Sequence, residues 1–85
     1  MKGAIKKINS LHQDPEAVIK KIGAMLRERR ERLGYTSHEP FAHEIPMDRS
    51  QYGKYEVGKD MQISTLLRIV NAMGLTLEDF FSKEA

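Results

Sequence analysis

The chain has 85 residues, of which 40% are hydrophobic, and this length fits a single small domain. It has no cysteine, which excludes disulfides and thiolate metal sites, and no apolar run near the ~20 residues that span a bilayer. The formal net charge of +2 does not by itself indicate a polyanionic partner.

Cations are nonetheless concentrated between Lys20 and Arg32, where six lysines and arginines accompany two glutamates. Such a basic region is typical of a protein that binds a polyanion. It is equally typical of a solvated helix face with ion pairs at i,i+4. The opening residues, MKGAIKKINS, lack the apolar core of a signal peptide, so we expect a cytoplasmic protein without a membrane partner.

Residues 1–13 leave several structures open. Apolar side chains recur there at roughly helical spacing, with lysines between them: Ala4, Ile5, Ile8 and Leu11. The pattern fits a short helix that packs on the domain or on a second subunit. It also fits a basic arm that lies on DNA, or a frayed terminus. We therefore divide the chain into an N-terminal arm or short helix, 1–13, and a domain, 14–85.

The first helix of the domain has a clear start signal. Asp14 suits the N-cap position, Pro15 suits the first helical position, and Glu16 places an acidic residue in the first turn. An apolar stripe at helical spacing then runs to Gly34, a residue that commonly ends helices. The stripe consists of Val18, Ile22, Met25, Leu26 and Leu33.

A short second helix is expected next. Ser37 is its best N-cap, with Thr36 as the rival, and Pro40 is tolerated near the third helical position because its missing amide has no intrahelical partner. Pro46 disfavours helical geometry in the residue before it, so the helix ends by Ile45. Its inward side chains are Phe41, Ala42 and Ile45.

The third helix follows almost at once, between an N-cap at Asp48 and a stop at Gly58. Two helices joined by so short a turn form a helix-turn-helix. Helical spacing puts Tyr52, Tyr55 and Val57 on the inner side. The outer side carries residues of the kind that meet phosphates and base edges, together with one glycine: Arg49, Ser50, Gln51, Gly53 and Lys54.

Two further helices complete the predicted domain. One begins near Ile63 and extends to Gly74, and the other is short, covers 77–81 and is capped by Thr76. The first of them carries the apolar residues Leu66, Leu67, Ile69, Val70 and Met73. Four side chains near this end are candidates for a dimer contact or, alternatively, for the core: Met73, Leu77, Phe80 and Phe81.

The ordered residues from about Ile22 to Phe81 resemble the Cro/C1-type (lambda-repressor-like, XRE) helix-turn-helix family. The resemblance is carried by Ile22-Gly23, Leu26, Arg30, Gly34, Ser37, Phe41-Ala42, Ile45, Asp48-Arg49-Ser50-Gln51-Tyr52, Tyr55-Glu56, Gly58-Lys59, Leu66-Leu67-Arg68-Ile69-Val70 and Met73-Gly74-Leu75-Thr76-Leu77-Glu78-Asp79-Phe80-Phe81. It implies an all-α, five-helix domain. It also implies a homodimeric transcriptional regulator, with repression the expected mode, that places the helix 49–57 in the major groove of double-stranded DNA.

The resemblance also assigns roles to individual residues. The expected base contacts are Arg49, Ser50 and Lys54, with Gln51 touching a base or the backbone. Phosphate and strand contacts are expected from His38 and Lys59, with help from the basic end of the first helix. An ion pair between the first and third helices is expected from Arg30 and Glu56.

The sequence departs from the family pattern at three places. Pro46 stands where the turn ordinarily has a glycine, so the turn must be built without positive φ there. One extra residue lies between Gly34 and Ser37. Gly53 lies in the middle of the helix 49–57, which the resemblance presents to DNA (the presented helix), and is expected to lower the stability of this helix by ~1 kcal/mol relative to alanine.

The residues that could form an active site lack the spacing of known catalytic motifs. The candidates for an active site are His12, His38, His43, Glu39 and Glu44, and they show no HExxH spacing, phosphate loop or nucleophile elbow. We therefore expect no enzyme, no metal and no cofactor. The remaining alternative is an antitoxin-like or other protein-interaction module, for which the segment 1–13 is the available feature.

Overall fold

A computed structural model describes residues 13–82, and the predicted segment 1–13 lies almost wholly outside this range. The described part is all-α, with no strand, and has five helices. They are α2 (Pro15–Arg32), α3 (His38–Glu44), α4 (Arg49–Glu56), α5 (Ile63–Ala72) and α6 (Leu77–Phe81). The predicted all-α, five-helix class is therefore confirmed.

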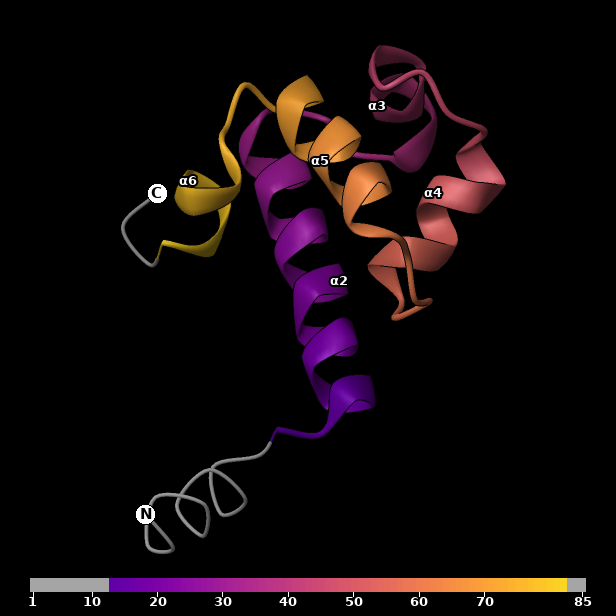
Figure 1. The fold of residues 1–85 in the computed structure, drawn as a ribbon. Coiled ribbons are helices and arrows are strands. Elements are labelled where there is room, and N and C mark those ends of the chain that lie inside the picture. Colours follow the sequence, from indigo (N-terminus) through magenta and orange to yellow (C-terminus); the bar gives the residue numbers. More distant parts are fainter. Residues whose placement is uncertain (1–12, 83–85) are drawn as a thin grey trace, which may run out of the picture.

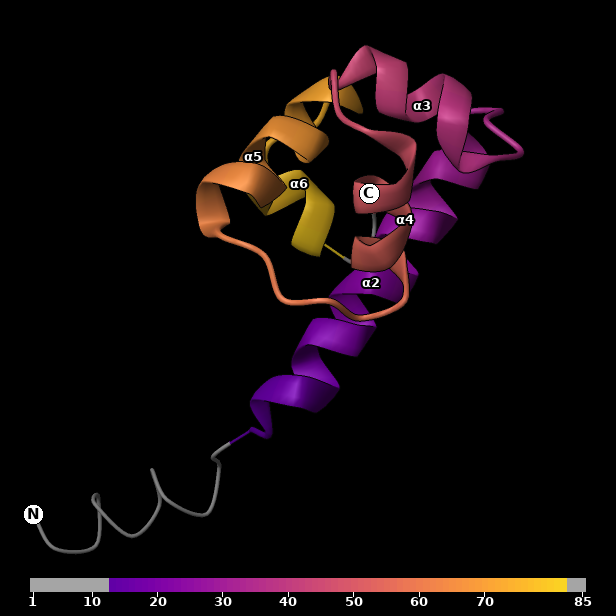
Figure 2. The same ribbon diagram turned by 90° about the vertical axis from the view of Figure 1, so that its right-hand side faces the viewer.

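The long helix α2 is the support on which the shorter helices assemble. In Figure 1 it runs diagonally, with α3 and α4 on one side and α6 on the other. Helix α4 packs against both α2 and α3, and α6 packs against α5. The first turns of α2 extend beyond the other helices in both views (Figures 1 and 2).

The core is built from one apolar side of each helix. Its fully buried members include Leu26 from α2, Phe41 from α3, Tyr52 from α4, Ile69 from α5 and Phe80 from α6. Aromatic packing joins the two helices of the motif, since the rings of Phe41 and Tyr52 lie edge to face with centroids 5.2 Å apart. The core thus fixes how α4 sits on α2 and α3.

The helix ends follow the local signals in the sequence. The Asp14 carboxylate accepts the amide of Ala17 at 3.1 Å, and Thr76 forms a capping box with Asp79. Gly58 follows α4 with φ +109°, a conformation that glycine adopts without steric cost. Ser37 precedes α3 as expected, although its side chain makes no capping hydrogen bond.

The turn between α3 and α4 is built without a residue of positive φ. The Ile45–Pro46 peptide bond is cis, and the amide of Met47 donates to the carbonyl of Ala42 at 2.8 Å. From α5, the Arg68 guanidinium donates to the carbonyl of Pro46 at 2.9 Å. The turn therefore contains Pro46 without any residue of positive φ, as the sequence predicts.

Some apolar side chains lie elsewhere than predicted. Val57, expected on the inner side of the third helix, is 76% exposed because it caps α4 after the last helical residue. Leu33 and Leu67 are also exposed, by 49% and 41%. Of the four candidates for a dimer contact, Phe80 and Met73 are buried in the core. Phe81 is 50% exposed and Leu77 is half-buried.

Candidate nucleic-acid interface

The presented helix α4 is held in place from its start and from its inner side. The Asp48 carboxylate accepts the amides of Ser50 at 3.0 Å and Gln51 at 3.2 Å, which satisfies two donors of the first turn. Tyr52 and Tyr55 are buried beneath the helix. These contacts leave the opposite side of α4 open to solvent.

Four of the six predicted DNA contacts lie on that open side. Arg49, Ser50, Gln51 and Lys54 are all exposed. The Gln51 amide donates to the Tyr55 hydroxyl at 3.0 Å, so part of its side chain is already engaged. The remaining side chains supply a guanidinium, a hydroxyl and an ammonium on one helical face, which are groups that pair with base edges and phosphates.

Lys59 lies just beyond the end of the same helix and is exposed. Its amide donates to the carbonyl of Lys54 at 3.0 Å, which closes the end of α4 and fixes where the loop begins. The structure thus places a cation at each end of the presented helix. A duplex that meets α4 along its length would meet both of them.

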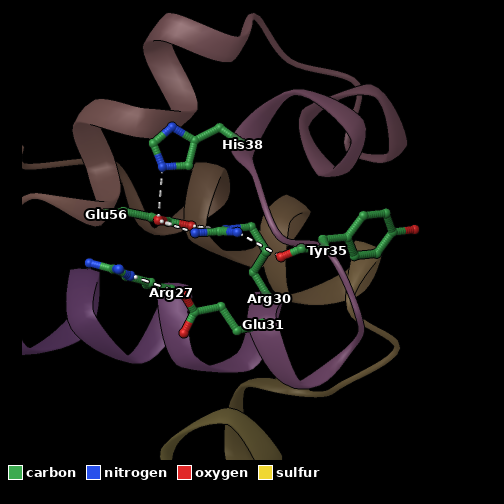
Figure 3. Close-up of polar contacts among 6 residues, drawn as sticks. All are labelled: Arg27, Arg30, Glu31, Tyr35, His38 and Glu56. Atoms are coloured by element: carbon green, nitrogen blue, oxygen red, sulfur yellow. Dashed lines mark hydrogen bonds and ion pairs between the residues drawn. The ribbon is translucent and has the colours of Figure 1, made fainter.

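A buried ion pair joins α2 to α4, between the two residues expected to pair. Arg30 donates from Nε to Glu56 Oε2 at 2.7 Å and from Nη2 to Glu56 Oε1 at 3.2 Å (Figure 3). Arg30 Nη1 also donates to the carbonyl of Tyr35 at 2.7 Å. The side chains of Arg30 and Glu56 are only 4% and 2% exposed, so this bidentate ion pair is shielded from water and salt.

The charges of this pair perturb each other and the neighbouring tyrosine. Burial alone raises the pKa of Glu56, but hydrogen bonds from Arg30 and its positive charge outweigh burial and hold that pKa below its ordinary value. The hydrogen bond to Glu56 in turn raises the pKa of Arg30. Burial, and then the Glu56 carboxylate, raise the pKa of the Tyr52 hydroxyl.

This arrangement predicts an acid-sensitive fold. Because the pKa of Glu56 is lowered on folding, the unfolded chain takes up its proton first as pH falls. The stabilisation is therefore complete above the unfolded pKa of about 4.3 and is lost as pH falls through the lower folded value, by about 1.4 kcal/mol per pKa unit. Urea unfolding between pH 7 and pH 2.5 tests this. If the free energy of unfolding falls by the same amount in a variant that combines Arg30→Met with Glu56→Leu, the acid sensitivity does not come from this ion pair.

His38 lies at the start of α3, where it was expected, but its ring turns inward. Its Nε2 lies 3.1 Å from Glu56 Oε1 (Figure 3). An ionised carboxylate only accepts, so Nε2 must carry the hydrogen, and in the neutral ring Nδ1 is an acceptor. A Cβ added at Gly53 would lie 2.8 Å from Nδ1, so the glycine of α4 makes room for this ring. Phosphate binding by the His38 ring stays a prediction.

The expectation that the basic end of α2 supplies free phosphate contacts is wrong for two of its four arginines. Arg29 and Arg30 are buried, and Arg29 Nη2 donates to the carbonyls of Phe80 at 2.9 Å and Ser82 at 3.1 Å. The other two are exposed but form i,i+4 ion pairs, Arg27 with Glu31 and Arg32 with Glu28. Much of this charge therefore holds the fold together.

One residue near the presented helix was missed by the sequence interpretation. Glu39, in the first turn of α3, places Oε1 3.7 Å from Arg49 Nη1. The sequence interpretation considered Glu39 as an active-site candidate, and no local spacing relates it to a residue ten positions later. The contact depends on how α3 and α4 pack.

Two further properties concern alternative functions. Among residues 13–82, no three histidine or acidic side chains lie together so that they could hold a metal ion. His12, one of the active-site candidates, lies outside this range. Within the same part of the chain, no helix has the length and apolarity needed to cross a membrane.

The packed pair α3–α4, with its polar outer side, defines a helix-turn-helix domain. A family model described as helix-turn-helix matches residues 26–80. The chain belongs to this family, the Cro/C1-type or XRE helix-turn-helix proteins, and is a DNA-binding transcription regulator. No curated protein and no solved structure matches the chain.

Proposed function

We propose that the protein binds double-stranded DNA sequence-specifically by placing α4 in the major groove, and that it represses transcription by occupying its site. The observation that carries this proposal is the solvent-open side of α4, on which Arg49, Ser50 and Lys54 are exposed while Tyr52 and Tyr55 anchor the opposite side. A helix buried on one side and polar on the other suits insertion into a groove that is about 12 Å wide.

Individual contacts divide between bases and backbone. Arg49, at the start of α4, is suited to the two acceptors of guanine, and Ser50 and Lys54 to neighbouring base edges. Lys59 and Gln51 are suited to phosphates, which fix the register without reading sequence. His38 is proposed for the same task, although Nε2 of its ring lies 3.1 Å from Glu56 Oε1.

A homodimer would double the site that is read. Two copies related by a two-fold axis place their presented helices on half-sites about one helical turn apart, ~34 Å. Phe81, which is 50% exposed, and the half-buried Leu77 are the remaining candidates for that contact. Because the proposed target is DNA, we also propose that the protein acts in the cytoplasm.

Replacing Arg49 by alanine tests the base-reading role of α4. We expect the binding free energy for the preferred site to weaken by ~1–3 kcal/mol and the preference at one base pair to relax, because the guanidinium no longer pairs with guanine. Equilibrium binding to duplexes that differ at single base pairs measures both effects. Arg27→Ala, which removes an exposed arginine from α2, is the matched control and should leave the base preference unchanged. A loss of equal size on every duplex would make Arg49 a phosphate contact.

A protein-interaction module remains the second candidate, because the described residues form a largely apolar hollow. Ile19 and Ile22 of α2 line this hollow of about 140 Å³ together with Asp60, Met61, Ile63 and Leu66, and Ile63 is 69% exposed. A stoichiometric protein partner in pull-down experiments, combined with DNA binding that does not survive ~150 mM salt, would favour this function.

A further inference from the structure

An acidic residue of α3 lies beside the exposed side of α4 that carries Arg49, Ser50 and Lys54. Glu39 and Arg49 are 60% and 63% exposed, and Glu39 Oε1 lies 3.7 Å from Arg49 Nη1. Asp48 is nearer in sequence, but its carboxylate already accepts the amides of Ser50 and Gln51. Glu39 is therefore the carboxylate that faces the Arg49 guanidinium.

A carboxylate at this place opposes DNA binding in general, because it repels the phosphates on either side of the groove. A gain in folding stability does not explain why a carboxylate is present here, since exposed ion pairs contribute little to stability. Its position beside the one arginine of α4 suggests a role in selection rather than in folding. Specificity often depends on a group that penalises the wrong partner.

The geometry of a guanidinium shows how the two residues would act together. Arginine has five N–H donors in a rigid fork, and Glu39 Oε1 lies 3.7 Å from one of the nitrogens that carry them, Nη1. The other donors stay available for O6 and N7 of guanine, which accept two hydrogen bonds in the major groove. Glu39 also draws the guanidinium away from the phosphates, where it would bind every sequence equally well.

We propose that Glu39 is a specificity-determining residue, which orients Arg49 toward guanine and lowers binding to other sequences. This inference rests on the proposed function, because it needs Arg49 to read a base. Glu39 reads no base in this role. It acts through Arg49 and is a positioning residue.

The test compares Glu39→Gln with the wild type and with Glu44→Gln, which removes the same charge from the other end of α3. Each protein is titrated with the preferred duplex, with a duplex changed at the guanine read by Arg49, and with a random duplex. For Glu39→Gln we expect several-fold tighter binding to the random duplex and about a tenfold loss of discrimination at that guanine. Glu44→Gln should leave the discrimination unchanged.

The same substitution in an Arg49→Ala background separates this role from a general charge effect. There, Glu39→Gln should no longer change the discrimination at that guanine, because the guanidinium that Glu39 orients is absent. The inference alone is overturned by either of two results. The affinity ratio between the preferred duplex and the duplex changed at the guanine is the same in Glu39→Gln as in the wild type, or Glu39→Gln lowers this ratio equally with and without Arg49. A wild type that binds all duplexes equally would contradict the proposed function and the inference with it. Both glutamates are exposed, so melting temperatures should stay close to that of the wild type.

Discussion

Replacing Glu56 by glutamine is expected to lower the free energy of unfolding by about 3–5 kcal/mol, a large share of the 5–15 kcal/mol typical of a small domain. The substitution leaves the Arg30 guanidinium buried, at 3% exposure, without a negative partner. It also replaces one of the two acceptor oxygens by an NH2 donor, so either Arg30 Nε or the pair Arg30 Nη2 and His38 Nε2 loses its acceptor. One carboxylate thus joins three helices.

Urea unfolding followed by circular dichroism measures this loss. Arg30→Met should be similarly damaging, whereas Arg30→Met with Glu56→Leu should cost much less than the sum, because no unpaired charge stays buried. Arg27→Ala provides the exposed comparison and should change stability by at most ~1 kcal/mol. If Glu56→Gln is no more damaging than Arg27→Ala, the buried pair does not hold the helices as described.

Replacing Gly23 by alanine is expected to destabilise the domain even though alanine is the better helix former. Intrinsic propensity favours alanine by about 1 kcal/mol. A Cβ at Gly23, however, would lie 2.5 Å from the carbonyl oxygen of Tyr55 and 2.6 Å from that of Glu56. These are backbone atoms at the end of α4, so α4 must move away from α2. Overpacking of this kind costs at least ~1–3 kcal/mol.

Helix propensity makes Gly23→Ala more stable, whereas the clash with the backbone of α4 makes it less stable. The sign of the change in stability therefore shows which contribution is larger. Thermal or urea unfolding should show a lower stability for Gly23→Ala, together with weaker DNA binding because the presented helix shifts. Ala24→Gly, at the exposed neighbouring position, should show the propensity effect alone, a loss of about 1 kcal/mol. A Gly23→Ala variant that is more stable than the wild type would show that α2 and α4 do not approach so closely.

Local signals in the sequence were sufficient to predict where the helices begin and end. Asp14, Asp48 and Thr76 cap helices as expected, and glycines follow α2 and α4 with positive φ. These features depend on hydrogen bonds between residues two to four positions apart, so the chain near each one determines the outcome. The exposed side of α4 follows from helical spacing for the same reason.

Contacts between distant residues were predicted only where the family resemblance supplied them. It placed Arg30 opposite Glu56, but nothing in the local sequence showed that Arg29 would bind the carbonyls of Phe80 and Ser82. The inward turn of the His38 ring likewise depends on the space left by Gly53. Helical spacing tells which residues share a face, and tertiary packing decides what that face meets.

The most direct test of the central claim, that the outer side of α4 reads base pairs, is selection from random duplexes followed by sequencing of the bound pool. We expect an enriched site with two-fold related halves and a guanine whose enrichment disappears at that position alone in Arg49→Ala. A bound pool that matches the input library would contradict the claim. So would an enriched site that neither Arg49→Ala nor Lys54→Ala alters.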